Sequence, residues 1–267
     1  MEFPKLTRAY YAFYYCKSLE KITSDFPNLD YAYGMFYYCE KLKEVSQYSY
    51  PLLTNGQYMF SGCKSLETFM KQTPKLQSAS YMFSSCSNLK EIGFNADNLT
   101  SANYMFSGCS SLASFNNQST LKLRNAYDMF YNCSNLQSVD MNLSALYDGD
   151  DMFQNCSKLS TISLGSLNAL QYAQYMFYGC TLLPKFTINM PIVRYGRYMF
   201  QNCSNLEEFS SSTPNLYDGE YMFRGCSKLS TLSNLDFSRL SMASYMFKGC
   251  SSLTSFSTPL PNLMSAA

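Results

Sequence analysis

"YMFSGCKSLETF", residues 58–69, is one copy of a pattern that runs along the whole chain. Close variants begin at residue 81 ("YMFSSCSNLKEI"), at residue 104 ("YMFSGCSSLASF") and at residue 198 ("YMFQNCSNLEEF"). Successive copies are 23 or 24 residues apart when they are counted from the Phe of each motif, which is Phe13, Phe36, Phe60, Phe83, Phe106, Phe130, Phe153, Phe177, Phe200, Phe223 and Phe247. A fixed period of this length is typical of repeat proteins. We therefore expect residues 1–267 to form one stacked domain, because a single unit cannot bury its own apolar side.

Positions within a copy are numbered here from that Phe, as position 0. A Cys stands at +3 in every copy, which accounts for all eleven cysteines of the chain, and a Leu stands at +6. Position −7 is Leu or Val, and position −4 is always Ala or Gly. The apolar columns predict a continuous core. The column of smallest residues indicates that a backbone passes too close there for a larger side chain.

The local spacing predicts two kinds of element in each copy. Apolar residues three and four apart in L-x-x-A-x-x-M-F-x-x-C indicate a helical segment of about two turns. Gly or Asn precedes the Cys in most copies, as at Gly108 and Asn132, and would end that segment with φ > 0. The L-x-x-F segment that follows predicts a short strand. The fold class expected is therefore an α/β repeat solenoid of about eleven units, with a parallel sheet on one face and helical turns on the other.

Composition argues against several classes of partner. Lys and Arg number 20 and Asp and Glu number 19, so no net field attracts nucleic acid or an anionic membrane. The start "MEFPKLTRAYYAF" lacks a basic segment that leads into an apolar run, and no stretch approaches the roughly 18 apolar residues of a membrane span. We expect neither nucleic-acid binding nor membrane insertion, and these residues alone predict no location.

The cysteines and methionines are predicted to be packing residues. Eleven cysteines is an odd number, no C-x-x-C spacing occurs, and the chain has no histidine. Free Cys and Met both fill apolar cores readily. We therefore expect reduced thiols, with no metal and no cofactor. Without histidine no nucleophile has an evident base, so we expect no enzyme activity.

Position −2 holds the candidate binding residues. Tyr stands there in eight copies, and on a helical wheel this position points away from the core. The rings would either stack to seal the outer edge of the solenoid or form a contact surface. Asp replaces Tyr in two adjacent copies, where the charges would form a solvated acidic patch or attract a cation or a basic partner group. The candidate ligand-binding residues are Tyr58, Tyr81, Tyr104, Tyr175, Tyr198, Tyr221, Tyr245, Asp128 and Asp151.

The motif L-x-x-A-x-x-M-F-x-x-C-x-x-L-x-x-F resembles the BspA-like leucine-rich repeat of mycoplasma and gut-bacterial surface proteins. The resemblance covers essentially the whole chain. It implies a right-handed leucine-rich-repeat solenoid and a role in adhesion or binding at a microbial surface, and it supplies no catalytic residues. The heavy use of tyrosine departs from the usual pattern of the family.

Two functions follow as hypotheses. The first is a non-enzymatic binding solenoid that recognises a host protein or a glycan, secreted or at the cell surface as the resemblance implies. The alternative is a structural or assembly component, such as a phage virion or tail protein, in a virion or the cytoplasm. Neither end of the chain shows a polar capping unit. We therefore expect a neighbouring domain or subunit at the ends.

Overall fold

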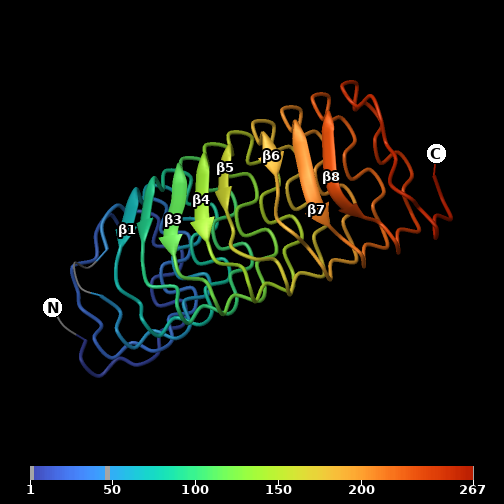
Figure 1. Ribbon diagram of the computed structural model, residues 1–267. Helices are drawn as coiled ribbons and strands as arrows, with labels where there is room; N and C mark the ends of the chain where they lie inside the picture. The colour runs from blue at the N-terminus through green and yellow to red at the C-terminus, as the bar shows by residue number, and fades with distance from the viewer. Residues whose placement is uncertain (1–2, 46–48, 267) are drawn as a thin grey trace.

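The computed structural model describes residues 3–45 and 49–266, together with all their side chains except that of residue 117. The chain winds into one elongated coil in which each copy of the repeat lies on the copy before it, with the two termini at opposite ends (Figure 1). Most residues that lie close together in space are far apart in sequence, as stacking between copies requires.

Short parallel strands form one side of the coil, as the sequence predicts. They are β1 (Thr68–Met70), β2 (Glu91–Gly93), β3 (Ser114–Gln118), β4 (Ser138–Met141), β5 (Thr161–Ser163), β6 (Lys185–Phe186), β7 (Glu208–Ser212) and β8 (Thr231–Asp236). Each strand pairs with the same position of the next copy, so that Phe69 lies beside Ile92 and Phe209 beside Leu232. The inward members of each strand are the apolar residues at +9.

The strands form three separate sheets, β1-β2, β3-β4-β5 and β6-β7-β8. Pro184 gives a reason for the break between β5 and β6. In the copy before it, the N–H of Ser160 bonds the carbonyl of Gln137 at 3.0 Å, and in the copy after it the N–H of Glu207 bonds the carbonyl of Pro184 at 2.8 Å. Proline has no N–H to donate to the carbonyl of Ser160, so this link is missing.

A second ladder runs along the opposite side at position −5. Its parallel bridges join twelve residues, from Arg8 through Asn125 to Ser265. The structure therefore does not show the eleven equal windings that were expected. The ladder at position −5 has a twelfth rung at Ser265, in an incomplete copy, whereas only eight copies form a regular strand.

The predicted helical segments are absent from the part of the chain that the structure describes, so the α/β class is wrong in its helical half. At position −2 the φ angles lie between 50° and 60°, and at +2 between 58° and 84°. These left-handed residues interrupt a helix twice within five positions. The N–H of Phe36 bonds the next copy at the Met59 carbonyl (2.8 Å), whereas the N–H of Cys39 bonds back to Phe36 (3.0 Å). Hydrogen bonds to the next copy and hydrogen bonds within the turn therefore alternate along this segment, in place of the regular i to i−4 bonds of an α-helix.

The predicted core columns are confirmed. The Phe, Cys and Leu side chains of the motif are fully buried from Phe36 to Leu229, and the Met column is buried with them. The position-0 rings form one continuous stack, with centroids 5.2–5.7 Å apart and planes within 14° of parallel. Offset parallel packing of this kind is favourable beyond the area that it buries.

The cysteines have a role beyond packing that the sequence did not reveal. All eleven are free thiols, and ten of them donate a hydrogen bond to the Phe carbonyl of the preceding copy at 3.0–3.2 Å. Burial raises the pKa of the Cys39 thiol to about 11, and it raises the pKa of the deeper thiols as well. The sulfurs therefore stay protonated, and each copy gains a link to its neighbour.

The small residues at −4 are buried against side chains rather than against the backbone that the sequence suggested. A Cβ on Gly56 would lie 3.1 Å from the sulfur of Met82, and one on Gly219 would lie 3.1 Å from a methyl group of Leu240. Both neighbours belong to the next copy. The column is thus limited by the Met and Leu columns that pack over it, and a methyl group is the largest side chain that fits.

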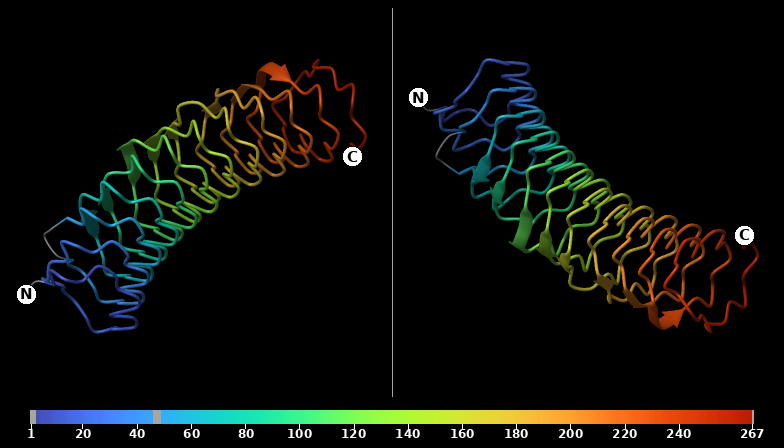
Figure 2. Two further views of the ribbon diagram at one scale, coloured as in Figure 1. Left: turned by 90° about the horizontal axis from the view of Figure 1, so that it is seen from below. Right: turned by 90° about the horizontal axis from the view of Figure 1, so that it is seen from above.

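The coil is curved. Figure 2 shows the strands on the outer, convex side and the closely spaced turns on the inner, concave side. The described residues include no helix that is long and apolar enough to span a membrane.

Candidate functional site

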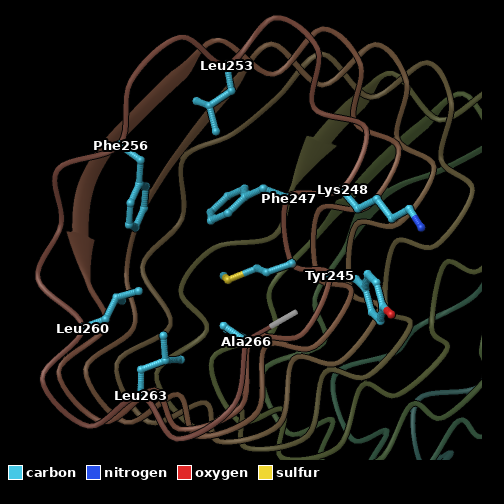
Figure 3. A pocket seen from close by; sticks show the side chains of 10 residues that line it. Tyr245, Phe247, Lys248, Leu253, Phe256, Leu260, Leu263 and Ala266 are labelled. Carbon is cyan, nitrogen blue, oxygen red and sulfur yellow. The ribbon is translucent and has the colours of Figure 1, made fainter.

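The tyrosine column, defined as the tyrosines at position −2, lies on the outer surface of the side opposite the strands. Figure 3 shows this arrangement at the C-terminal end: Phe247 points inward, Phe256 lies on the strand side, and Tyr245 and Lys248 lie outside on the far side. The prediction that position −2 faces away from the core is confirmed. Since the strands follow the convex side, the column follows the concave face (Figure 2).

The column forms two stacks of parallel rings. In the first stack, Tyr58, Tyr81 and Tyr104 have centroids 4.5 and 4.4 Å apart. In the second, the distances are 4.6 Å from Tyr175 to Tyr198, 4.7 Å from Tyr198 to Tyr221 and 5.1 Å from Tyr221 to Tyr245. Each ring covers the face of the next. The stacks therefore present ring edges and hydroxyl groups to solvent, and their faces are free only at the ends.

Every residue of this column has the left-handed backbone conformation, with φ from 50° at Tyr11 to 60° at Tyr198. For a side chain with a Cβ this conformation costs about 1–2 kcal/mol per residue. Gly and Asp tolerate it best, which explains why they are the residues that replace Tyr. The mixture of Tyr with Gly and Asp in one column was the sequence signal for φ > 0, and it was missed.

Two tyrosines outside the column, Tyr33 and Tyr127, provide aromatic contacts where the column is interrupted. A Cβ on Gly34 would lie 2.6 Å from the Tyr11 ring, so this ring occupies the space that a side chain would need. Tyr33, at −3, contacts Tyr11 and Tyr58 with centroids 5.4 Å from each. Tyr127, also at −3, lies edge-on to Tyr104 at 5.2 Å. Aromatic contact therefore runs unbroken from Tyr11 to Tyr127.

The aspartates fill the remaining gap between the two stacks. Asp128 is buried, with 5% of its surface exposed, and burial raises the pKa of its carboxyl, against the effect of the neighbouring Tyr104 and Tyr127 hydroxyls, which lower it. Asp150 accepts hydrogen bonds from the backbone N–H of Gln174 at 2.7 Å and from its side-chain amide at 3.1 Å. The structure thus brings both predicted aspartates together with Asp148 and Asp150 in one acidic cluster.

Burial and mutual repulsion favour the neutral form of these carboxyls. Burial raises the pKa of Asp151 to about 7, with further repulsion from Asp128, Asp150 and Asp148. Burial also raises the pKa of Asp150 to about 6, against the hydrogen bonds from Gln174. Among the described residues, no three Cys, Asp or Glu side chains are arranged so that they could hold a metal ion.

Comparison with known proteins identifies the family to which this repeat belongs. The model of the family described as "BspA type Leucine rich repeat region" matches the chain over residues 7–127 and 126–254, with six copies. The chain belongs to the BspA-type leucine-rich repeat family. The resemblance seen in the sequence motif is therefore confirmed over nearly its whole length.

Two solved structures similar to this BspA-type chain are bacterial leucine-rich repeat proteins. One, from Bacteroides ovatus ATCC 8483, is 19% identical, with 93% of this chain and 81% of the other covered and a TM-score of 0.49. The second is a leucine rich cell surface protein from Faecalibacterium prausnitzii A2-165, also 19% identical, with 87% and 78% covered and a TM-score of 0.41. Such distant likeness says nothing about a ligand. No curated protein matches the chain.

The first two copies of this BspA-type chain carry additional exposed tyrosines that sequence reasoning did not single out. Tyr10, Tyr14 and Tyr15 are 56%, 48% and 51% exposed, and Tyr37 and Tyr38 lie beside them in the next copy. The angles between these rings vary, from 27° between Tyr37 and Tyr38 to 68° between Tyr15 and Tyr38. This end of the concave face therefore leaves more aromatic surface open than the two parallel stacks do.

Proposed function

We propose that this chain is a non-enzymatic binding solenoid whose concave face recognises an extended ligand through the tyrosine column. The observation that carries the proposal is the run of half-buried tyrosines held in a strained backbone conformation on that face. Within each of the two stacks their hydroxyls and ring edges recur once per copy, so a long ligand that lies along the coil would meet the same contact several times.

The backbone strain supports a role for the rings beyond folding. Position +2 has the same left-handed conformation, and from Gly62 to the last copy it is filled by Gly, Asn or Ser. A column that had only to fold could use Gly, Asn or Asp at −2 in the same way. The stacking contacts offset part of the cost of strain. Tyrosine also supplies rigid contact area and a hydroxyl with little loss of side-chain entropy, as binding surfaces require.

The acidic cluster gives the face a second kind of contact. Tyr175 begins the second stack, and the preceding residue of its column is Asp151, so one face of its ring has no stacked tyrosine. We propose that a basic group of the ligand binds here, since it would contact a carboxylate and an aromatic face together. Tyr175 and Asp151 are the residues we assign to this contact, and the buried Asp128 of the adjacent copy adds negative charge without touching the ligand.

The partner class remains the one expected from the sequence, a protein or a glycan, encountered at a microbial surface. The assembly alternative is favoured by one observation. At the C-terminal end the core columns line an open apolar cavity, where Phe256 is 39% exposed and Phe247, Leu253, Leu260 and Leu263 are half-buried (Figure 3).

The test replaces Tyr175, Tyr198 and Tyr221 together by Asn, which tolerates the left-handed conformation and therefore preserves the fold. Wild type and variant are screened against immobilised matrix proteins and glycans. Loss of a buried contact ring at a binding hot spot costs about 2 kcal/mol or more, so we expect at least tenfold weaker binding to the wild-type ligand.

The matched control is Tyr217→Asn, which changes a 43%-exposed tyrosine outside the column and should leave binding unchanged. Circular dichroism and melting temperature monitor folding. Full binding by the folded triple variant would contradict the proposal.

A further inference from the structure

The junction between the seventh and eighth copies, which contain Phe153 and Phe177, is not fastened on its strand side. Among the described residues, no backbone hydrogen bond joins residues 160–167 to residues 184–190, and β5 and β6 belong to different sheets. Pro184 has no N–H to supply there. A cleft of about 230 Å³ lies between the two strand segments. The convex side of this junction is therefore held by side-chain contacts alone.

The tyrosine column is interrupted at the same junction. Position −2 is Asp151 in the seventh copy and Tyr175 in the eighth, so no pair of rings stacks across it. Two other junctions lack only one of these contacts. Where β2 and β3 are unpaired, Tyr81 and Tyr104 stack at 4.4 Å. Where Asp128 and Asp151 leave the column without rings, β4 and β5 are paired. The junction between the seventh and eighth copies lacks both.

The turn side and the core of this junction remain bonded. Four backbone N–H groups of the seventh copy donate to carbonyls of the eighth: Gly149 to Tyr172 at 3.0 Å, Asp151 to Gln174 at 2.8 Å, Phe153 to Met176 at 2.8 Å, and Asn155 to Tyr178 at 2.7 Å. In the core, the rings of Phe153 and Phe177 stack at 5.2 Å, and the Cys180 thiol donates to the Phe153 carbonyl at 3.1 Å. These contacts form a line of attachment about which the strand side can open and close.

The copies on either side are joined more firmly. Before the junction, β3, β4 and β5 form one sheet, and the first tyrosine stack runs from Tyr58 to Tyr104. After it, β6, β7 and β8 form another sheet, and the second stack runs from Tyr175 to Tyr245. We call copies one to seven the first arm and the copies from the eighth onward the second arm. Each arm has its own tyrosine stack.

We propose that the junction between the seventh and eighth copies is a hinge at which the two arms bend toward the concave face. In a repeat protein each copy contacts only its neighbours, so motion is favoured at an interface that lacks contacts present at the others. Opening of the strand-side cleft bends the coil in this direction, and no stacked pair of rings on the concave side opposes it. Hinge bending changes the angle between the two tyrosine stacks.

The hinge goes beyond the proposed function, because it is a property of the free protein and is tested without a ligand. Two nitroxide spin labels are attached to the whole chain, and the distribution of distances between them is measured by pulsed electron paramagnetic resonance. Cys16, the exposed thiol, is first replaced by Ser, so that only introduced cysteines react.

The two pairs of labels are matched in position and in separation. Ala113→Cys with Glu207→Cys places labels four windings apart across the hinge, and Lys43→Cys with Gln137→Cys places them four windings apart within the first arm. All four residues are exposed and occupy position +7 on the strand side. Four windings span about 19 Å at about 4.8 Å each. We expect the distribution across the hinge to be at least twice as wide as that of the control pair.

Asp151→Tyr tests the cause of the motion. The added ring would stack on Tyr175 and resist bending, so the distribution across the hinge should narrow toward the control width. Asp128→Tyr adds a ring to the same column one copy earlier, does not bridge the hinge, and should leave the width unchanged. Equal widths for the two label pairs without these substitutions would overturn the hinge. So would an undiminished width in an Asp151→Tyr variant that keeps the native circular dichroism spectrum.

Discussion

At the scale of single residues, the repeated cysteine is explained by its hydrogen bond. A thiol is small and apolar enough for the core, and it also donates to the Phe carbonyl of the preceding copy, as Cys109 does to Phe83 at 3.1 Å. The carbonyl of Phe83 already accepts the N–H of Cys86 at 3.0 Å, so the thiol adds a second bond to it. Column +3 thus contributes to cohesion between copies at the centre of the molecule.

This arrangement predicts the reactivity of the thiols. Cys16 belongs to the first copy and is exposed, whereas the other ten thiols are buried. Alkylation of the native protein without reductant should therefore modify Cys16 quickly and the rest only after unfolding. Mass spectrometry of the unfolded protein should then find eleven labelled cysteines. A lower total because of internal disulfides would contradict the thiol column.

The small column at −4 makes a separate prediction. Ala102 is fully buried, and the equivalent glycines show that the next copy leaves room for little more than a methyl group. Ala102→Leu should lower the free energy of unfolding by about 1–3 kcal/mol or more through overpacking. Ala113→Leu, at an exposed position after Leu112, is the matched control and should change stability little. Equal shifts in melting temperature for the two variants would show that the column is not sterically limited.

At the scale of elements, the strands could be predicted and the helical turns could not. Leu, Phe and Met at spacings of three and four are common to a helix face and to the turns found here, because both bury one side of a compact segment. The deciding feature is the left-handed conformation at −2 and +2. Gly and Asn revealed it at +2, whereas the tyrosines concealed it at −2. The acidic cluster could be predicted, since Asp128 and Asp151 occupy one column and Asp148 and Asp150 stand beside Asp151 in the sequence. The hydrogen bonds from Gln174 to Asp150 could not be predicted, because they depend on the turn geometry.

The acidic cluster sets the pH dependence of this part of the solenoid. The pKa of Asp151 is about 7 in the folded protein, above its unfolded value, so the folded state binds the proton more tightly. Stability therefore falls as pH rises from about 4 to about 7 and stays lower above that range. Asp151→Asn should remove part of this fall and stabilise the protein at pH 8 by about 1 kcal/mol, a value reduced for solvent screening.

Thermal unfolding at pH 5 and pH 8 measures the effect. Asp97→Asn changes an exposed aspartate outside the cluster and should keep the wild-type difference. If Asp151→Asn lowers the melting temperature at pH 8, the carboxylate makes a stabilising contact and the assignment is wrong.

At the scale of the whole molecule, the spacing of the rings agrees with the curvature. Tyrosines on the concave face stack at 4.4–5.1 Å, whereas the phenylalanines of the core are 5.2–5.7 Å apart. Windings that approach more closely on one side bend the coil toward that side (Figure 2). Sequence periodicity predicted the stack and its core, but the direction of bending depends on these small differences and could not be predicted.

The most direct test of the concave recognition surface is a tyrosine footprint. The protein is nitrated with and without a ligand found in the binding screen, and modification at each tyrosine is quantified by mass spectrometry. The account predicts that bound ligand protects Tyr175, Tyr198 and Tyr221 and leaves Tyr217, outside the column, as reactive as before. Protection of Tyr217 with no change at the three stacked tyrosines would contradict it.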